Sequence, residues 1–299
     1  MRCPATVRAT IKSAAKKTIA RIRGLARMCD TEMNFTKMNG AGNDFVVVDN
    51  RDGSRALSKE SIGRLCDRHR GVGADGVLAV EPPQAGADFR MRYYNADGGE
   101  ADMCGNGARC FARFAARLLP GQTEALSFET PAGLIRARFS GELVTINMSE
   151  PHGLREPTDL EVEGLGACRV HFLNTGVPHA VVYVPDVAAV DMAKAGASLR
   201  WNPAFAPQGA NANFAQILSP GSLLLRTFER GVEGETLACG TGVCAAALLH
   251  HLATGAASPV SVRVRGGETL EVGFDVSGSA RNVTLKGPAD FVFDGEINV

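Results

Sequence analysis

The sequence lacks any apolar run long enough to cross a membrane. Its longest apolar stretches, FVVVD at 45–49 and HAVVYV at 179–184, have the length of strands, whereas a spanning helix needs about 20 residues. No apolar signal peptide is recognisable either, so we expect free thiols in a reducing cytoplasm rather than a disulfide framework. The 299 residues, 45% hydrophobic and 21% charged, fit a globular protein of two domains.

Metal and cofactor motifs are also missing. The eight cysteines form no C-x-x-C pair, which argues against a structural zinc site, and there is no H-E-x-x-H motif and no Asp-rich calcium loop. A pyridoxal-phosphate enzyme needs a Schiff-base lysine, and no lysine stands in a recognisable cofactor motif. GVGADG at 71–76 fits G-x-G-x-x-G, but it follows a predicted helix and precedes a predicted strand, the reverse of the dinucleotide-binding order. We therefore expect no metal and no cofactor.

Residues 1–32 differ from the rest of the chain in charge. They hold eight basic residues against two acids, so the remaining body carries six more acids than bases and does not attract nucleic acid in general. Apolar residues recur between the basic ones at helical spacing. Three interpretations are open: an upstream extension with translation starting at Met28 or Met33, an organelle transit peptide, or an arm for nucleic acid or a membrane surface. We place this basic leader outside the domains, as a disordered segment or an amphipathic helix.

A repeat singles out two of the cysteines. GEADMCGNGARC at 99–110 and GETLACGTGVC at 234–244 align without a gap at an offset of 135 residues. The same offset lays FVVV at 45–48 over AVVY at 180–183, which indicates a duplicated domain rather than a duplicated loop. The aligned identities are Gly99 with Gly234, Glu100 with Glu235, Cys104 with Cys239, Gly105 with Gly240, and Gly107 with Gly242.

The predicted elements follow the same order in both halves. In the first half, periodicity predicts strands at 35–38 and 45–49, a helix at 58–69, strands before the turn at 95–99, a helix at 108–119, and three strands near 125–147. In the second half it predicts strands before and after a helix at 187–199, a helix at 243–253, and strands to about 285. Whether the closing strand, FVFDGEINV, joins the sheet of the first half is left open by the sequence.

Each repeated cysteine stands at the start of a predicted helix marked by Gly-x-Gly. The positive end of the helix dipole and its unpaired N–H groups predict a thiol pKa lowered from about 8.5 toward neutrality. Such N–H groups also bind a carboxylate, and glycine lets a ligand approach the backbone. Two such halves facing each other would place thiols on opposite faces of one α-carbon, which is the arrangement needed for racemisation or epimerisation. Two inert cysteines in a duplicated scaffold are the alternative.

Six stretches resemble the motifs of bacterial diaminopimelate epimerases, in the same order from about residue 33 to the C-terminus. They are MNGAGNDFVVVDNR (38–51), RHRGVGADG (68–76), YNADGGEADMCGNGARCFARF (94–114), GVPHAVV (176–182), NANFAQI (211–217) and ERGVEGETLACGTGVCAAA (229–247). The resemblance implies an α+β fold of two pseudo-symmetric duplicated domains, each a curved mixed sheet wrapped around a central helix, with the active site in the cleft between them. We expect 33–148 with 286–299 in one domain and 149–285 in the other.

The resemblance implies a cofactor-independent isomerase that interconverts LL- and meso-2,6-diaminopimelate for lysine and peptidoglycan synthesis. It makes Cys104 the base that abstracts the α-proton of the LL isomer and Cys239 the acid on the opposite face, with these roles exchanged in reverse. The resemblance also implies that the backbone of Gly105, Asn106, Gly240 and Thr241 holds the reacting carboxylate and that Glu229 holds the ammonium group at the reacting centre. It implies that the distal amino-acid end is held by Arg230, Asn95 and Asn211, with Asn43 also near the site. His179 is expected near Cys239, where it helps to set the protonation of that thiol.

Structural interpretations stay open for several of these residues. Asn95 is also a plausible turn residue, His179 a hydrogen-bonded core residue, and Arg230 a member of a solvated ion pair. Glu100 and Glu235 we interpret as structural, capping or pairing with backbone before the cysteine turn. The other cysteines of the domains, Cys66, Cys110, Cys168 and Cys244, we interpret as packing residues.

Two positions depart from the family pattern. The family often has Asn where this chain has Val177, and Gln where it has Gly76; both bear on substrate holding and not on proton transfer. A proline or hydroxyproline racemase-like enzyme and a non-catalytic carboxylate-binding scaffold therefore stay as alternatives. We expect a small-molecule amino-acid substrate, no nucleic-acid or membrane partner, and a cytoplasmic location, with organelle import through residues 1–32 and a homodimer as open alternatives.

Overall fold

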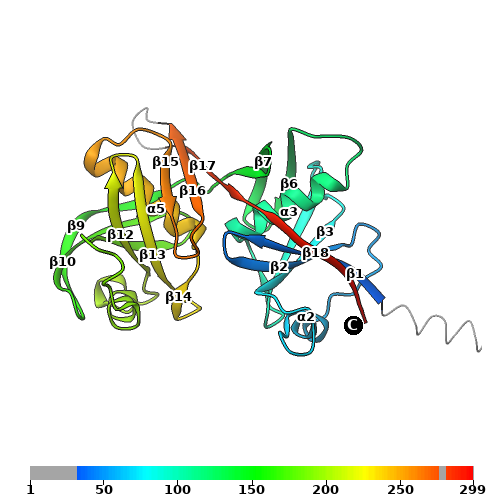
Figure 1. Cartoon of the computed structure of the whole chain (residues 1–299), viewed down its shortest axis with the longest axis horizontal. Helices are drawn as coiled ribbons and strands as arrows, with labels where there is room; N and C mark the ends of the chain where they lie inside the picture. The colour runs from blue at the N-terminus through cyan, green and yellow to red at the C-terminus, as the bar shows by residue number, and fades with distance from the viewer. Residues whose placement is uncertain (1–31, 276–280, 299) are drawn as a thin grey trace, which may run out of the picture.

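The computed structural model describes residues 32–275 and 281–298, so the basic leader lies outside the described residues except for Glu32. Two similar halves stand side by side, each with one long helix enclosed by strands (Figure 1). Among the described residues, no helix is long and apolar enough to cross a membrane. The α+β fold of two duplicated units, expected from the sequence, is confirmed.

The first half runs from β1 to β8. Its elements are β1 (Glu32–Gly40), β2 (Asn43–Asp49), α2 (Lys59–Cys66), β3 (Gly76–Glu81), β4 (Phe89–Asn95), β5 (Glu100–Ala101), α3 (Gly105–Arg117), β6 (Ala125–Thr130), β7 (Gly133–Ser140) and β8 (Leu143–Asn147).

The second half repeats this order after one inserted strand, and one further strand ends the described chain. Its elements are β9 (His152–Val162), β10 (Gly166–Asn174), β11 (Pro178–Tyr183), the π-helix η1 (Met192–Gly196), α4 (Ala197–Arg200), the 3-10 helix η2 (Pro203–Phe205), β12 (Asn211–Ser219), β13 (Ser222–Glu229), β14 (Gly234–Thr236), α5 (Gly240–Thr254), β15 (Val260–Arg263), β16 (Thr269–Asp275), β17 (Arg281–Pro288) and β18 (Asp290–Asn298).

The strand pairings repeat between the halves. β2 runs parallel to β3 as β11 runs parallel to β12, and β4 runs parallel to β6 as β13 runs parallel to β15. The short strand before each repeated cysteine pairs antiparallel with the same partner, β5 with β4 and β14 with β13. The sequence offset of 135 residues therefore reflects a duplicated sheet.

β2 is apolar at consecutive positions because both of its faces are covered. Phe45 and Val47 pack into the core around α3, whereas Val46 and Val48 pack into a second cluster beneath α2. A strand buried on both faces loses the alternation of apolar and polar residues. In β11, which occupies the equivalent place, Val181 faces the core around α5 and Val182 the opposite cluster.

α3 and α5 are the central helices of the two halves. α3 contacts β1, β2, β3, β4, β6, β7 and β8, and α5 contacts β10, β11, β12, β13, β15 and β16. The aromatic rings of Phe111 on α3 and Phe128 on β6 lie 4.6 Å apart between centroids. Residues of both halves belong to one continuous hydrophobic cluster, so the halves share a core.

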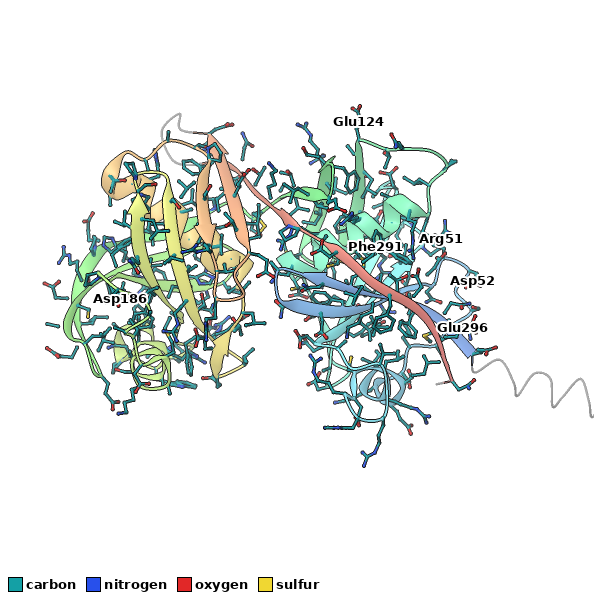
Figure 2. All side chains as sticks on the ribbon, in the orientation of Figure 1. Arg51, Asp52, Glu124, Asp186, Phe291 and Glu296 are labelled. Carbon is teal, nitrogen blue, oxygen red and sulfur yellow. The ribbon has the colours of Figure 1, made fainter. Side chains whose placement is uncertain are left out.

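The chain crosses between the halves twice. β8, the last strand of the first half, pairs antiparallel with β17, and this ladder joins the sheets of the two halves. At each crossing, the next strand pairs in the other half. β9 follows β8 but pairs with β10 of the second half, and β18 follows β17 but pairs with β1 of the first half. β18 runs across the outside of the first half, where Phe291 and Glu296 are labelled in Figure 2.

Two details of the secondary structure differ from the sequence-based expectation. The helix expected at 187–199 is shorter, since only η1 and α4 form from residue 192 onward. No strand was expected at β9, whose residues are mostly exposed and carry few apolar side chains. A strand on a solvated edge gives little hydrophobic periodicity, which explains why it was missed.

Leu285 on β17 supports both central helices. It is fully buried, and its Cδ2 lies 3.6 Å from an ideal Cβ built on Gly105 and 3.0 Å from one built on Gly240. We expect Leu285→Ala to lower the free energy of unfolding by about 2–5 kcal/mol, because the cavity lies in a shared core. Chemical denaturation measures this. Leu154→Ala, at a residue 56% exposed, is the control and should change stability little; equal losses in the two variants would contradict the assignment.

Candidate active site

Cys104 is the N-cap of α3. Its backbone is extended (φ −137°, ψ 121°), and its Sγ accepts a hydrogen bond from the Gly107 N–H at 3.5 Å. Gly107 packs closely on Phe45, because an ideal Cβ there would lie 3.4 Å from the Phe45 ring. Gly107 thus lets the first turn of α3 pack against β2 while its N–H points at the Cys104 sulfur.

Cys239 occupies the same position on α5. Its backbone is likewise extended (φ −117°, ψ 106°), and its Sγ lies 3.5 Å from the Thr241 hydroxyl. Six percent of Cys239 is exposed, whereas Cys104 is partly exposed. Both cysteines are free thiols.

An arginine–glutamate pair anchors the strand before each cysteine. Arg92 on β4 donates two hydrogen bonds to Glu100, at 2.9 and 2.7 Å, and Arg226 on β13 donates two to Glu235, at 2.7 and 2.9 Å. Both glutamates thus have a structural role, but they pair with arginine side chains and not, as expected from the sequence, with the backbone. The repeat therefore extends to arginines that the sequence alignment did not single out.

The starts of the two central helices meet. An ideal Cβ on Gly240 would lie 3.8 Å from the Gly105 Cα and 3.0 Å from Leu285. Asn106 on α3 donates through Nδ2 to the Ala238 carbonyl at 3.3 Å, across the boundary between the halves. Gly105, Asn106, Gly240 and Thr241, expected to hold one carboxylate, are thus brought to one place, where the N-terminal N–H groups of two helices converge.

Burial raises the pKa of both thiols. For Cys104 desolvation outweighs the Gly107 and Asn106 N–H groups, which favour the thiolate, and the Glu229 carboxylate raises the pKa further. For Cys239 desolvation is again the main cause, followed by Glu229. The sequence-based prediction of thiol pKa values near neutrality is therefore wrong, because burial outweighs the N–H groups of the helix starts.

Glu229 ends β13 beside both cysteines. It accepts a hydrogen bond from the Thr236 hydroxyl at 2.9 Å. Burial raises the pKa of Glu229, while Thr236 and the Cys239 thiol oppose that rise. A partly buried carboxylate whose charge acts on both thiols is suited to hold a cation.

His179 on β11 is fully buried and lies against the first turn of α5. An ideal Cβ on Gly242 would lie 3.4 Å from His179 Nδ1. Asn213 Nδ2 lies 3.1 Å from that Nδ1 and can only donate, so the ring carries its proton on Nε2, which has no hydrogen-bond partner among the described residues. Burial, assisted by Arg230, lowers the pKa of His179 to about 3. His179 is therefore a neutral core histidine with a spare donor.

Asn211 and Arg230 lie together at the end of the second sheet. Asn211 is 3% exposed; its Nδ2 donates to the Pro178 carbonyl at 3.1 Å and its Oδ1 accepts from the Arg230 N–H at 2.8 Å. Arg230 is half-buried, and no carboxylate of the described residues lies within 4.0 Å of its guanidinium, so the ion pair considered for it does not form. Its charge is available to a ligand.

Asn43 and Asn95 belong to the first half. Asn43 accepts a hydrogen bond from Asn106 Nδ2 at 2.6 Å and donates to Asp75 at 3.0 Å, so it is tied to the start of α3. Asn95 is exposed at the end of β4, where its carbonyl accepts from the Gly98 N–H at 2.9 Å. The turn role considered for Asn95 is thus present, and its side chain faces solvent.

Three residues near the site were missed in the sequence. Arg109 and Asn213 lie inside motifs quoted for the resemblance but received no role. Tyr93 on β4 packs edge-on against Phe45, with ring centroids 6.1 Å apart, and its ring would lie 2.7 Å from an ideal Cβ on Gly76. The Tyr94 carbonyl oxygen would lie still closer to that Cβ, at 2.4 Å, so a glutamine side chain does not fit at Gly76 in this arrangement.

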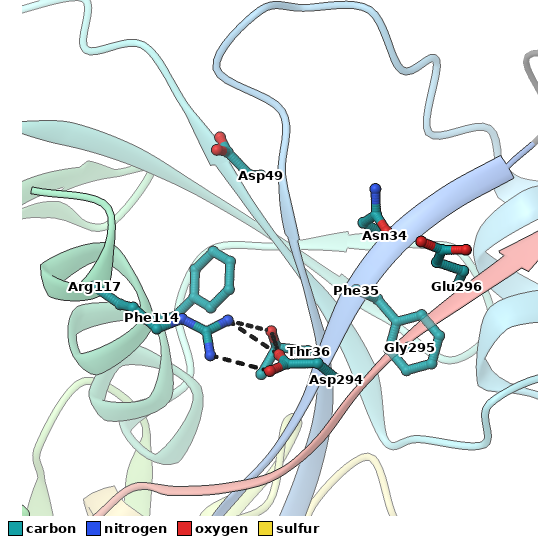
Figure 3. A pocket seen from close by; sticks show the side chains of 9 residues that line it. All are labelled: Asn34, Phe35, Thr36, Asp49, Phe114, Arg117, Asp294, Gly295 and Glu296. Carbon is teal, nitrogen blue, oxygen red and sulfur yellow. Dashed lines mark hydrogen bonds and ion pairs between the residues drawn. The ribbon is translucent and has the colours of Figure 1, made fainter.

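Other cavities do not contain the expected residues. A cavity of about 550 Å³ lies between β1, β18 and the end of α3, where Arg117 donates to Thr36 and Asp294 (Figure 3). Thr36, Arg117 and Asp294 pair with one another there, and neither cysteine lines this cavity. In the described part of the chain, no group of three or more His, Cys, Asp or Glu residues could hold a metal ion. The paired cysteines therefore mark the strongest candidate site.

Known proteins resemble the chain over most of its length. The sequence profile of the family described as Diaminopimelate epimerase matches residues 35–152 and 171–292. A diaminopimelate epimerase of Chlorobaculum tepidum is 43% identical over 265 residues, spanning 88% of this chain and 100% of the relative. One of Aquifex aeolicus is 42% identical over 279 residues, spanning 89% and 98%.

Solved structures share the fold at low sequence identity. A PhzF-family phenazine biosynthesis protein of Bacillus anthracis superposes with a TM-score of 0.71 at 18% identity, covering 90% of this chain and 99% of that one. A hydroxyproline epimerase of Agrobacterium vitis gives a TM-score of 0.66 at 19% identity, covering 90% and 93%.

The match to these relatives over most of the chain defines the protein as an isomerase of the amino-acid epimerase class. Within that class, the chain belongs to the diaminopimelate epimerase family.

The neutral state of His179 predicts how stability depends on pH. Its pKa falls from 6.5 to about 3 on folding, so the unfolded chain binds more protons between these values. Stability is therefore fully present above pH 6.5 and is lost as the pH falls toward 3, with a slope of up to about 1.4 kcal/mol per pH unit from this residue. Chemical unfolding across this range measures the slope.

Substitution separates His179 from the other titrating groups. His179→Gln should flatten the slope, whereas His152→Gln, at an exposed residue of β9, should leave it unchanged. Identical slopes in wild type and His179→Gln would show that His179 is not the group responsible.

Proposed function

We propose that the chain interconverts LL- and meso-2,6-diaminopimelate by moving the α-proton between Cys104 and Cys239. The observation that carries this proposal is the meeting of the α3 and α5 starts, each with a free cysteine as its N-cap. Family membership supports both the substrate and the reaction, which is a step in the synthesis of lysine and of peptidoglycan precursors.

The carboxylate of the reacting centre lies between the two helix starts. The N–H groups of Gly105, Asn106, Gly240 and Thr241 donate to it, and the two helix dipoles favour its negative charge. When the α-proton leaves, the electron pair of the broken C–H bond delocalises into this carboxylate. The same donors then stabilise the added charge, which is the main electrostatic contribution to such a step.

The proton transfer uses the two thiols in opposite protonation states. The Cys104 thiolate takes the α-proton of the LL isomer, forming an S–H bond as the C–H bond breaks. The Cys239 thiol then delivers its proton to the opposite face and becomes the thiolate. After this forward turnover Cys104 is the thiol and Cys239 the thiolate, so the starting state returns only after a proton exchange with solvent or a reverse turnover. In the reverse direction the two cysteines exchange roles.

Substrate binding favours the thiolate form of the cysteine that acts as the base. Burial raises the pKa of both thiols, so a nearby cation is needed to lower it. The substrate ammonium group, held by Glu229, brings a positive charge beside the sulfurs and offsets the carboxylate that now raises their pKa. His179 adds the N–H of its Nε2, which lacks a partner.

The distal amino-acid end is held by the residues around the cleft. Arg230 offers an unpaired guanidinium to the distal carboxylate, and Asn211 fixes the backbone of Arg230. Asn95 completes this end from the first half, whereas Asn43 lies near the reacting end through the hydrogen bond that it accepts from Asn106. A substrate with a charged amino-acid group at both ends matches a site with one clamp at the helix starts and a second cation beyond it.

The two units that close on the substrate are residues 33–148 with 286–299, and residues 149–285. The two crossings of the chain, after β8 and after β17, are the hinges in this scheme. Because the reaction needs free thiols, we place the enzyme in the reducing cytoplasm.

A substrate panel tests the proposal. Wild-type protein with reductant should epimerise LL-2,6-diaminopimelate and leave proline and trans-4-hydroxyproline unchanged. Cys104→Ser and Cys239→Ser should each lower kcat/KM by at least about a hundredfold, because a serine hydroxyl does not ionise near neutral pH. Cys110→Ala and Cys244→Ala, at buried cysteines further along the same two helices, are matched controls that should keep turnover.

The alternatives give different results in the same panel. Turnover of proline without turnover of diaminopimelate would favour a racemase-like enzyme of the hydroxyproline epimerase kind. Binding of diaminopimelate without turnover by folded wild type, unaffected by either serine substitution, would favour a carboxylate-binding scaffold.

A further inference from the structure

Arg109 is a fully buried cation on α3, one turn after Cys104. Its guanidinium donates only to neutral groups. The acceptors are the carbonyls of Pro288 (3.2 Å), Gly105 (3.3 Å) and Gly40 (3.5 Å) and the side-chain oxygen of Asn106 (2.8 Å). No carboxylate of the described residues lies within 4.0 Å of it.

The other arginines that follow on α3 are paired with acids. Arg113 lies 3.2 Å from Glu142 and 3.6 Å from Asp290, and Arg117 lies 3.1 Å from Asp294. A buried cation without a counter-ion costs free energy, whereas a partly exposed pair costs little. The most deeply buried arginine of the helix is thus the one that lacks an acid, which indicates that its counter-ion is supplied from elsewhere.

The surrounding backbone leaves room for this side chain. An ideal Cβ on Gly287 would lie 3.2 Å from Arg109 Nε, and one on Gly40 would lie 2.6 Å from the Asn106 carbonyl oxygen. Glycines on β17 and β1 therefore admit the guanidinium and the first turn of α3 from both sides. Arg109 is accommodated by several elements and does not merely fill a gap.

Arg109 determines which way the Asn106 amide points. A guanidinium has only donors, so the Asn106 side-chain oxygen must face it. The amide Nδ2 must then face the other way, where it donates to Asn43 at 2.6 Å and to the Ala238 carbonyl at 3.3 Å. Through Asn106, the charge of Arg109 is linked to the contact between the two helix starts.

Arg109 is the main fixed cation among the titratable groups around Cys104. These groups come from α3, β4, β13 and the turn before α5, and they are Arg109, Cys110, Tyr93, Glu229 and Cys239. Arg109 lowers the pKa of the Cys104 thiol, in opposition to burial and to Glu229. It acts in the same direction on the buried Cys110 and Cys244, so its field reaches both central helices.

We propose that Arg109 is a positioning residue of the active site: it orients Asn106 at the meeting point of the two helices and supplies the positive charge whose counter-ion is the substrate carboxylate. This inference rests on the proposed function for the identity of the anion. The geometry around Asn106 does not depend on that function.

Two variants separate the charge of Arg109 from its geometry, with Arg113→Gln as the matched control on the same helix. Arg109→Gln removes the charge; Arg109→Lys keeps it but loses the planar guanidinium that donates to the Asn106 side chain. For each variant, the rate of iodoacetamide alkylation of Cys104 is followed against pH by peptide mass spectrometry. Steady-state kinetics with LL-2,6-diaminopimelate and the melting temperature are measured alongside.

In Arg109→Gln, alkylation of Cys104 near neutral pH should slow by about tenfold, and its pH profile should move to higher pH, because less thiolate forms. In Arg109→Lys the alkylation profile should stay near that of wild type, while KM rises by about tenfold or more as Asn106 is released. Arg113→Gln should change neither.

A purely structural Arg109 predicts another pattern. Both variants would melt at lower temperature, with the alkylation profile and KM of wild type, and that result would overturn the proposal. If Arg109→Gln does not fold, Arg109→Lys decides, since an unchanged KM overturns the positioning role and a raised KM supports it. Wild type that shows no turnover would refute the proposed substrate, while the alkylation profiles would still test the role of Arg109.

Discussion

The contact between the first turns of α3 and α5 is the constraint on which the rest of the structure depends. Two helix starts carry partial positive charges of the same sign and unpaired N–H groups, so packing must hold them together until an anion arrives. The packing is visible: glycine at 105 and 240, Leu285 against both, and the β8–β17 ladder between the halves. Arg109 adds a further buried charge of the same sign. The site is thus prepared for an anion by the fold itself.

Duplication supplies the symmetry of the site, and divergence supplies its direction. The arginine–glutamate pairs before Cys104 and Cys239 are the same in both halves. At the end of the strand that bears each arginine, however, the first half has Asn95 and the second has Glu229. One half therefore ends this strand with a carboxylate and the other with a neutral amide, and in the proposed reaction this difference lets the two thiols act on a substrate whose groups differ from side to side.

Much of this arrangement could be predicted from the sequence, because each motif of the repeat at an offset of 135 residues is a short contiguous stretch that can be recognised without the fold. Both cysteines were expected at helix starts, and both are N-caps. The pKa direction of the thiols could not be predicted, since it depends on burial between halves that meet only in the folded chain. The same holds for Asn213 and His179, which are 34 residues apart in sequence. β9 was missed because an exposed edge strand has no apolar alternation.

The central claim, that each thiol serves one face of the α-carbon, is tested most directly by α-proton exchange in D₂O. Proton NMR would follow LL- and meso-2,6-diaminopimelate with Cys104→Ala and with Cys239→Ala. The account predicts that Cys239→Ala exchanges the α-proton of the LL isomer and that Cys104→Ala exchanges the proton at the opposite configuration, with no epimerisation in either. Epimerisation by a single-thiol variant, or exchange of both isomers by both variants, would contradict it.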